Sequence, residues 1–352
     1  MILGFGLSLF SHLRQLPYTA PAMLNHWSDA YVRGWNCVLG PVGVILNAIL
    51  IVLILSKTPG SLRCYSLILL VSSVFDCAIS LGSSMVTTRI FPTEGHIFTM
   101  FSGLCNIVSD NLEIKAHFCM SWYVLQFQSY LLNHVVLIIS SIYRVTIMVA
   151  PLCKEIKYAL PAICFVYSTV HVGYSTWVLL GDLIPLDQVI FAIAGVRPEL
   201  IGSGWTYFGV LELDMPMFFM SMILPWLVIV FTLSSRWFVG RRVRKMHFSK
   251  LLEKHHKDLS NALLAQTLAP VLSILGAVAY LIVRENEIDS VPLFENLMLT
   301  PIVLMAVINP IVTIYSVQPY RTTVAGWGKS TKMKIYPAVA VSAIVNPPPH
   351  LN

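Results

Sequence analysis

The sequence predicts an all-α membrane protein, a seven-transmembrane helix bundle with its N-terminus outside and its C-terminus inside the cell. The composition points to a membrane, since 56% of the 352 residues are hydrophobic and only 11% are charged, against about 25% charged in soluble domains. Seven apolar stretches each supply the roughly 20 residues that a helix needs to cross about 30 Å of hydrocarbon. The basic residues fall mostly on alternate loops, which sets the orientation.

The expected helices follow directly from the apolar stretches, with short loops between them. They are Asn36–Leu55, Tyr65–Val86, Met120–Val149, Tyr158–Leu180, Met215–Ser234, Leu259–Val283 and Phe294–Val317. The third is the longest, so we expect part of it to protrude or tilt. Residues 1–35 then form an extracellular segment, 36–317 the bundle and 318–352 a cytoplasmic tail.

The charge distribution determines which side each loop faces. The loops after the first, third and fifth spans, with the C-terminal tail, hold 17 of the 23 Lys and Arg residues. Positively charged loops stay in the cytoplasm, so these loops are expected inside. The net charge of +6 therefore faces anionic lipid headgroups or a cytoplasmic partner, and we predict no nucleic-acid binding.

Two of the seven cysteines, Cys105 and Cys119, lie well within the expected outer loops. Because the cell exterior is oxidising, they are the plausible disulfide pair. A bridge would close a loop of about 15 residues, which is worth on the order of 3 kcal/mol. It would attach the first outer loop to the start of the third span. Two free cysteines are the alternative.

Three polar residues within the spans are candidates for one buried cluster. Asn47 lies midway down the first span, Asp76 midway down the second, and Asn309 precedes Pro310 in the seventh. Polar groups are costly in hydrocarbon and face the bundle interior. With two amides nearby, Asp76 could form a water or cation site and act in a switch. Alternatively, these residues only join helices, at about 0.6 kcal/mol per contact.

The third span carries a polar stripe that ends at Arg144. Gln126, Tyr130 and Asn133 recur every three or four residues, so they line one helix face and could bind a ligand entering from outside. His134 lies beside the stripe, but no second metal ligand has suitable spacing. We therefore expect no metal and no cofactor.

Prolines interrupt three consecutive spans, at Pro225, Pro270 and Pro310. Each removes a backbone hydrogen bond and favours a bend or hinge. The fifth and sixth spans are joined by a strongly basic loop, 236–257, which includes Arg241, Arg242, Arg244 and Lys245. That loop can bind lipid headgroups, dock a cytoplasmic protein, or do both. No phosphate-binding loop, nucleophile elbow or zinc-protease motif is present, so an enzyme is not predicted.

Together these features resemble a seven-helix G-protein-coupled receptor. That superfamily has recurrent polar residues in helices one, two, three and seven, matched here by Asn47, Asp76, Arg144 and Asn309-Pro310. More narrowly, residues 35–321 are similar to nematode chemoreceptors of serpentine receptor class delta. The segments that carry this likeness are 57–66, 89–92, 142–144, 266–270 and 309–321.

The resemblance implies a chemosensory receptor in the plasma membrane, in sensory neurons or their cilia. Its small-molecule ligand would bind between the outer halves of spans three, five, six and seven, and a heterotrimeric G protein would bind near Arg144 and the basic loop. The chain departs from the superfamily at Tyr143, where an acidic residue is usual, and at Tyr315, two positions late. It also lacks a cysteine in the second outer loop, which favours the Cys105–Cys119 pair.

Three other classes of membrane protein remain as alternatives. A ligand-gated channel built of seven-helix subunits would have its N-terminus inside, against the charge distribution. A secondary transporter would have inverted repeats and broken helices, and neither is visible. A receptor-like protein that no longer couples to a G protein is also compatible with Tyr143.

Overall fold

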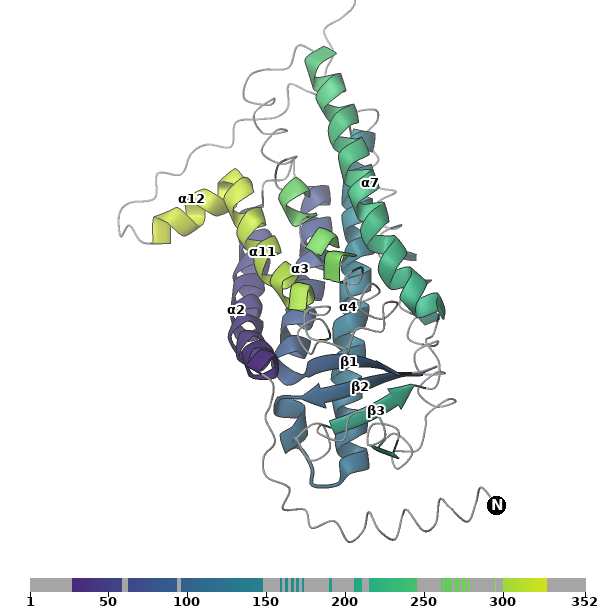
Figure 1. Ribbon diagram of the computed structural model, residues 1–352. Helices are drawn as coiled ribbons and strands as arrows, with labels where there is room; N and C mark the ends of the chain where they lie inside the picture. Colours follow the sequence, from purple (N-terminus) through teal and green to yellow (C-terminus); the bar gives the residue numbers. More distant parts are fainter. Residues whose placement is uncertain are drawn as a thin grey trace, which may run out of the picture.

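The computed structural model describes residues 27–58, 63–93, 96–147, 206–210, 215–245 and 300–327, with scattered residues between 159 and 191 and between 261 and 295. Five long helices run side by side: α2 (Trp27–Lys57), α3 (Arg63–Met85), α4 (Leu112–Ile147), α7 (Met215–Lys245) and α11 (Thr300–Ser316) (Figure 1). The short helix α12 (Gln318–Trp327) leaves α11 at 95°.

Four of these helices are long and apolar enough to cross a membrane: Ala30–Lys57, Tyr65–Met85, Leu112–Thr146 and Ile223–Arg242. The bent pair α11 and α12 counts as a fifth. These helices correspond to the expected first, second, third, fifth and seventh spans. The expected fourth span, 158–180, lies mostly outside the described residues. The expected sixth is described only in part, within the apolar helix Leu263–Gly276.

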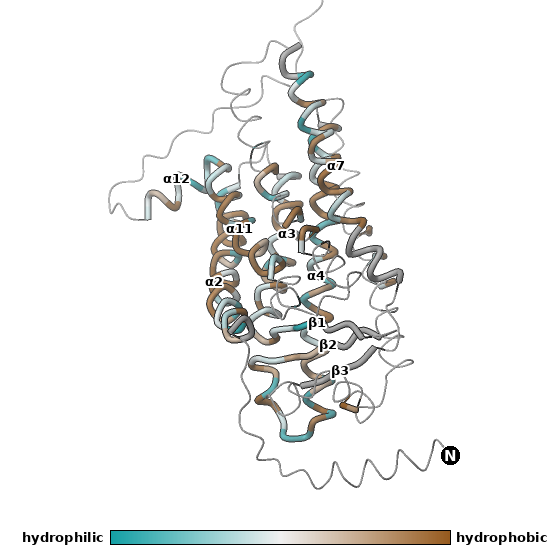
Figure 2. The backbone as a smooth tube through the Cα atoms, viewed as in Figure 1, coloured by the Kyte–Doolittle hydropathy of each residue, from teal (hydrophilic) through white to brown (hydrophobic). Residues whose placement is uncertain are grey.

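The side chains are distributed as a lipid environment requires. Apolar residues on the outer face of α2 are exposed, including Ile45 at 59% and Leu55 at 71%, whereas Asn47 and Asp76 are at most 1% exposed. Hydrophobic residues dominate the middle of α2 and α11 (Figure 2). Burial of polar groups beside exposure of apolar ones is the opposite of a soluble protein and confirms the membrane-protein prediction.

Small residues allow the first helices to pack closely. Gly40 and Gly43 of α2 lie against the serines of α3, and a Cβ atom added at either would collide with a serine hydroxyl. Gly82 of α3 faces α4, where an added Cβ would lie only 2.7 Å from Cβ of Gln126. Membrane helices approach closely through such residues. Close packing of α3 and α4 accompanies hydrogen bonds between their polar side chains, such as Gln126 to Ser83 and Asn133 to Asp76.

A three-stranded antiparallel sheet lies at one end of the bundle, where α3 ends and α4 and α7 begin (Figure 1). Its strands are β1 (Thr87–Thr93), β2 (His96–Ser102) and β3 (Thr206–Val210), in the order β1-β2-β3. Thr88 pairs with Phe101, and Phe101 pairs with Thr206. We call this the sheet end and the opposite end the α12 end. The sheet was not predicted, although its strands are rich in β-branched and aromatic residues.

Three helices extend well beyond the expected bounds. α2 begins at Trp27 rather than Asn36, within the segment expected to precede the bundle. α4 begins at Leu112 rather than Met120, because the Asn111 side chain accepts hydrogen bonds from the backbone N–H groups of Glu113 (2.9 Å) and Ile114 (3.2 Å) and so caps the helix. α7 continues beyond Ser234 to Lys245, through residues expected in a loop. Arg and Lys are good helix formers and suit a helix C-terminus, which explains the extension.

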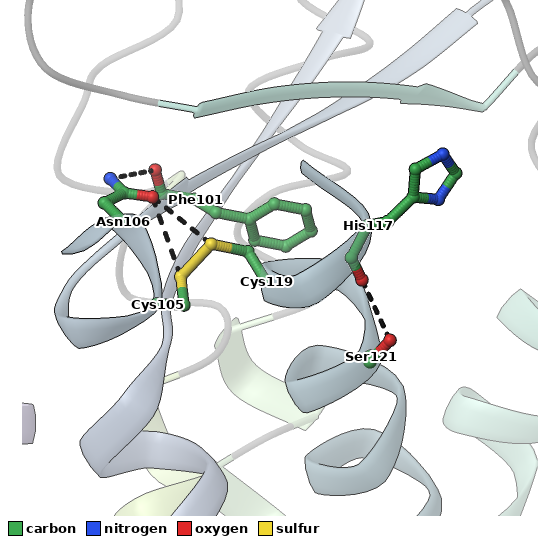
Figure 3. The surroundings of a disulfide bond; sticks show 6 residues. All are labelled: Phe101, Cys105, Asn106, His117, Cys119 and Ser121. Atoms are coloured by element: carbon green, nitrogen blue, oxygen red, sulfur yellow. Dashed lines mark hydrogen bonds between the residues drawn. A yellow bond between two sulfur atoms is a disulfide. The ribbon is translucent and has the colours of Figure 1, made fainter. Parts of the chain in front are cut away.

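The structure joins Cys105 to Cys119 by a disulfide, with the Cα atoms 5.1 Å apart (Figure 3). Cys105 lies in the short 3-10 helix η2 (Leu104–Ile107) and Cys119 in the second turn of α4. Both are fully buried and pack with Phe101 of β2. Asn106 donates a hydrogen bond to the Phe101 carbonyl oxygen at 3.3 Å. The bridge therefore attaches the sheet to the start of α4.

Candidate functional site

A buried polar cluster around Asp76 connects α3, α4 and α11. The Asp76 carboxylate accepts a hydrogen bond from the Asn133 amide at 2.6 Å and from the Asn309 amide at 3.0 Å. Ser72 in turn donates to the Asn133 side-chain oxygen at 2.7 Å. Asp76 and Asn309 thus meet as the sequence suggested, and Asn133, expected to face a ligand, completes the cluster instead. All four residues are less than a tenth exposed.

Asn47 of α2 forms a hydrogen bond with the backbone of α11. Its amide donates to the carbonyl oxygen of Ala306 at 2.8 Å and to that of Gly43 at 2.9 Å. Pro310 has no N–H, so the carbonyl four residues earlier, at Ala306, loses its helical partner. Asn47 supplies the missing donor from α2. The sequence grouped Asn47 with Asp76; in the structure its amide bonds to two backbone carbonyls, Gly43 of its own helix and Ala306 of α11.

Arg144 lies near the α12 end of α4, and its described partner is a tyrosine. The guanidinium donates a hydrogen bond to the Tyr65 hydroxyl at 2.8 Å and lies 5.5 Å from the centre of the Tyr65 ring. The Tyr65 ring stacks with Tyr143 at 6.1 Å. Arg144 is only 8% exposed, and none of the described carboxylates forms an ion pair with it. The contacts described for Arg144 offset only part of the cost of burying its charge. Arg144 is therefore weakly held in this position.

The other basic candidates lie on the last turns of α7, at the same end of the bundle as Arg144 (Figure 1). Arg241 and Arg242 are exposed, and the Arg241 guanidinium lies 5.0 Å from the Trp237 ring centre. Arg244 and Lys245 belong to the helix, but their side chains lie outside the described set. α7 is joined to α4 near this end by Ser141 and Thr232, whose hydroxyls are 3.3 Å apart.

A pocket opens at the sheet end between α2, β1, α4 and α11. Its polar lining includes Asn36, Thr88 and Gln126, and its apolar lining includes Tyr123, Phe127 and Ile302. The pocket is narrow, with room for a group about the size of a water molecule. No charged residue is among its described lining residues.

The three residues of α4 that were predicted to contact a ligand lie in three different surroundings. Gln126 lines the pocket and donates a hydrogen bond to Ser83 at 2.8 Å. Tyr130 is buried deeper, with its ring centre 4.3 Å from that of His134. His134 in turn contacts the Tyr130 carbonyl oxygen at 2.8 Å. Asn133 lies in the Asp76 cluster.

A row of aromatic rings along α4 was missed from sequence. Tyr123 stacks on Phe127 at 5.9 Å, and Phe127 contacts Tyr130 at 6.3 Å. Phe101 of β2 extends the row, with its ring centre 5.8 Å from that of Tyr123. The spacing of four and then three residues is the helical period and was a detectable signal. The row connects the sheet to the middle of the bundle.

A buried ion pair next to the pocket was also not anticipated. Arg89 of β1 binds the carboxylate of Glu295, with both side chains at most 2% exposed. Glu295 lies just before α11, at the start of the expected seventh span, and is a second buried carboxylate besides Asp76. The pair fastens β1 to the segment that leads into α11. Since the partners are 206 residues apart, no local pattern indicates the contact.

Comparison with known proteins identifies the family. A family model described as "Serpentine type 7TM GPCR chemoreceptor Srd" matches residues 32–326. Serpentine receptor class delta-3 of Caenorhabditis elegans is 25% identical over 329 residues, which cover 86% of this chain and 89% of the relative. Serpentine receptor class delta-1 of the same organism is 23% identical over 290 residues, covering 79% and 76%.

The matched region contains the described helices apart from the first residues of α2 and the last residue of α12, together with the disulfide, the Asp76 cluster and Arg144. A chemoreceptor family also agrees with the prediction that the chain is not an enzyme. The chain therefore belongs to the Srd family of serpentine seven-transmembrane chemoreceptors and is a multi-pass membrane protein of the GPCR-like receptor class.

Proposed function

We propose that the protein is a chemosensory G-protein-coupled receptor that detects a small environmental or pheromone-like ligand and activates a heterotrimeric G protein. The sheet end would face outward at the plasma membrane, in sensory cilia where the cell has them, and the α12 end would face the cytoplasm. This orientation rests on the 17 of 23 basic residues that the sequence assigns to the loops after the first, third and fifth spans and to the tail. The N-terminal segment is then extracellular and residues 318–352 form the cytoplasmic tail.

The ligand would enter at the sheet end, where Gln126 lines a pocket bounded by α2, α4 and α11. A ligand that binds one arrangement of these helices more tightly shifts the population toward that arrangement. α11 is the element best placed to respond, since it contacts the pocket through Ile302, the Asp76 cluster through Asn309 and α2 through the Asn47 bond. Asp76, Asn47, Asn309 and Pro310 would therefore form the switch.

The observation that carries the proposal is the state of Arg144. A cation lies buried near the α12 end of α4, with a tyrosine hydroxyl in place of a carboxylate partner among the described residues. Release from Tyr65 would make Arg144 available to a G protein. Arg241, Arg242, Arg244 and Lys245 on the end of α7 would add a basic docking surface, while also contacting lipid headgroups.

The proposal is tested by ligand-stimulated nucleotide exchange on purified G proteins, using receptor in nanodiscs and a library of volatile and small metabolite compounds. We expect Arg144→Ala to abolish exchange at normal surface expression. Lys115→Ala is the matched control, since it removes one positive charge from α4 at the sheet end and should leave exchange intact. A ligand-evoked current that needs no G protein would instead identify a channel, and binding without exchange would identify a non-coupling receptor.

A further inference from the structure

The lining of the sheet-end pocket has a chemical character that restricts its ligand. Asn36, Thr88 and Gln126 supply neutral amide and hydroxyl groups, and Tyr123, Phe127 and Ile302 supply an apolar wall. Pockets of this kind bind the apolar body of a ligand and orient it through a few polar contacts.

Thr88 is the polar group in the pocket that most clearly lacks a partner. Its side chain is 6% exposed, and its hydroxyl has no hydrogen-bond partner among the residues that the structure describes. Burial of an unpaired hydroxyl costs free energy, so a buried hydroxyl normally has a partner. An occupant of the pocket that hydrogen-bonds to Thr88 would remove this cost.

The two side-chain amides of the pocket already donate hydrogen bonds within the protein, so their oxygens are the groups that a ligand can use. Gln126 donates its N–H to Ser83 at 2.8 Å, and Asn36 donates to Thr87 at 3.3 Å. In this arrangement both side-chain oxygens remain acceptors. Together with the Thr88 hydroxyl, they suit a group that both donates and accepts hydrogen bonds.

The buried charges of Arg89 and Glu295 are not among the described lining residues of the pocket. Arg89 follows Thr88 in β1, and successive side chains of a strand point to opposite faces. Arg89 is paired with Glu295, so its charge is compensated within the protein. A charged ligand would therefore lie against a lining that has no described counter-ion, and its desolvation would cost much free energy.

From these observations we infer that the pocket lined by Thr88, Asn36 and Gln126 binds an uncharged ligand, with a small hydrogen-bonding head group such as a hydroxyl against Thr88. The ligand has an apolar body, which lies on the Tyr123–Phe127 stack and Ile302. The narrow interior admits only the head group, so the rest of the ligand lies toward the mouth or widens the pocket. This inference deepens the proposed function by naming the class of ligand. It rests on the proposed function only in treating this ligand as the signal that the receptor detects.

The test measures binding directly, because binding does not depend on G-protein coupling. The full-length protein in nanodiscs is heated with a library of six- to ten-carbon compounds in matched sets, each a primary alcohol, the carboxylate and the ammonium of equal length. We expect alcohols, and not their charged counterparts, to raise the melting temperature. Calorimetry then gives the affinity of the best alcohol.

Thr88→Val keeps the shape of the side chain and removes the hydroxyl. It should weaken binding of the best alcohol by roughly fivefold, the effect of one lost hydrogen bond of about 1 kcal/mol. Ser102→Ala is the matched control, since it removes another buried hydroxyl without a described partner, on the neighbouring strand and outside the pocket lining. Its affinity should equal that of the wild type.

Three results would overturn the inference: equal stabilisation by the charged compounds, equal affinity of Thr88→Val and wild type, or no stabilisation by any alcohol, which would mean that the pocket holds water only. If alcohols bind as expected but nucleotide exchange is absent, the ligand class stands and G-protein coupling fails. The two proposals can therefore be separated.

Discussion

Tyr65→Phe should activate the receptor without a ligand. The substitution removes the hydroxyl that accepts the Arg144 hydrogen bond at 2.8 Å and leaves the ring that the guanidinium faces at 5.5 Å. A hydrogen bond to a charged group contributes about 1.5–3 kcal/mol. The remaining cation–π contact contributes about 0.5–1 kcal/mol. The resting state therefore loses most of the described restraint on Arg144.

Even the lower value for this hydrogen bond, about 1.5 kcal/mol, would change basal activity measurably. If only the resting state makes this hydrogen bond, losing about 1.5 kcal/mol raises the ratio of active to resting receptor roughly tenfold. A resting receptor that is about 1% active would become about 10% active, within the range of ordinary minor states. Basal nucleotide exchange, normalised to the amount of receptor at the surface, reports this ratio directly.

Tyr143→Phe is the control, because it alters the ring stacked on Tyr65 without removing a hydrogen bond to Arg144. Its basal exchange should stay at the wild-type level. Unchanged basal exchange in Tyr65→Phe at equal surface density would refute the reasoning, and so would equal activation by Tyr143→Phe. The double substitution Tyr65→Phe with Arg144→Ala should be silent, since the activated state still needs the arginine.

Further substitutions test three contacts of the bundle itself, by melting temperature in detergent and by surface expression. Asn47→Leu leaves a backbone carbonyl of α11 unpaired and should cost about 1–3 kcal/mol of stability. Cys119→Ser opens the disulfide and should cost about 3 kcal/mol, whereas Cys37→Ser, at a free and exposed cysteine, should cost almost nothing. Arg89→Ala should destabilise by about 3–5 kcal/mol because Glu295 is left as a buried charge, and replacing both partners by apolar residues should recover much of that loss.

The limits of the sequence prediction are clearest at the helix ends and the sheet. Hydropathy locates where hydrocarbon begins and ends, so it marks Met120 as the start of a span, while α4 already begins at Leu112 through the Asn111 cap. The strands at 87–102 were expected as a loop because they are short and lie between strongly apolar segments. Their pairing with residues 206–210 depends on a partner far along the chain.

The sequence by itself determined the class of the protein, the bundle of apolar helices and the polar residues that must face inward. Each depends on local properties: the length of an apolar run, the helical period and the cost of polar groups in lipid. Asp76, Asn309 and Arg144 were therefore recognisable before any contact was known.

Only the tertiary structure decided which groups these residues bind. The rotation of each helix about its axis directs Asn133 to Asp76 and directs Asn47 to a carbonyl 259 residues away. It likewise gives Arg144 a tyrosine on another helix as its partner. Such pairings follow from packing between helices, at small residues such as Gly82, and packing over long separations leaves no periodic trace in the chain.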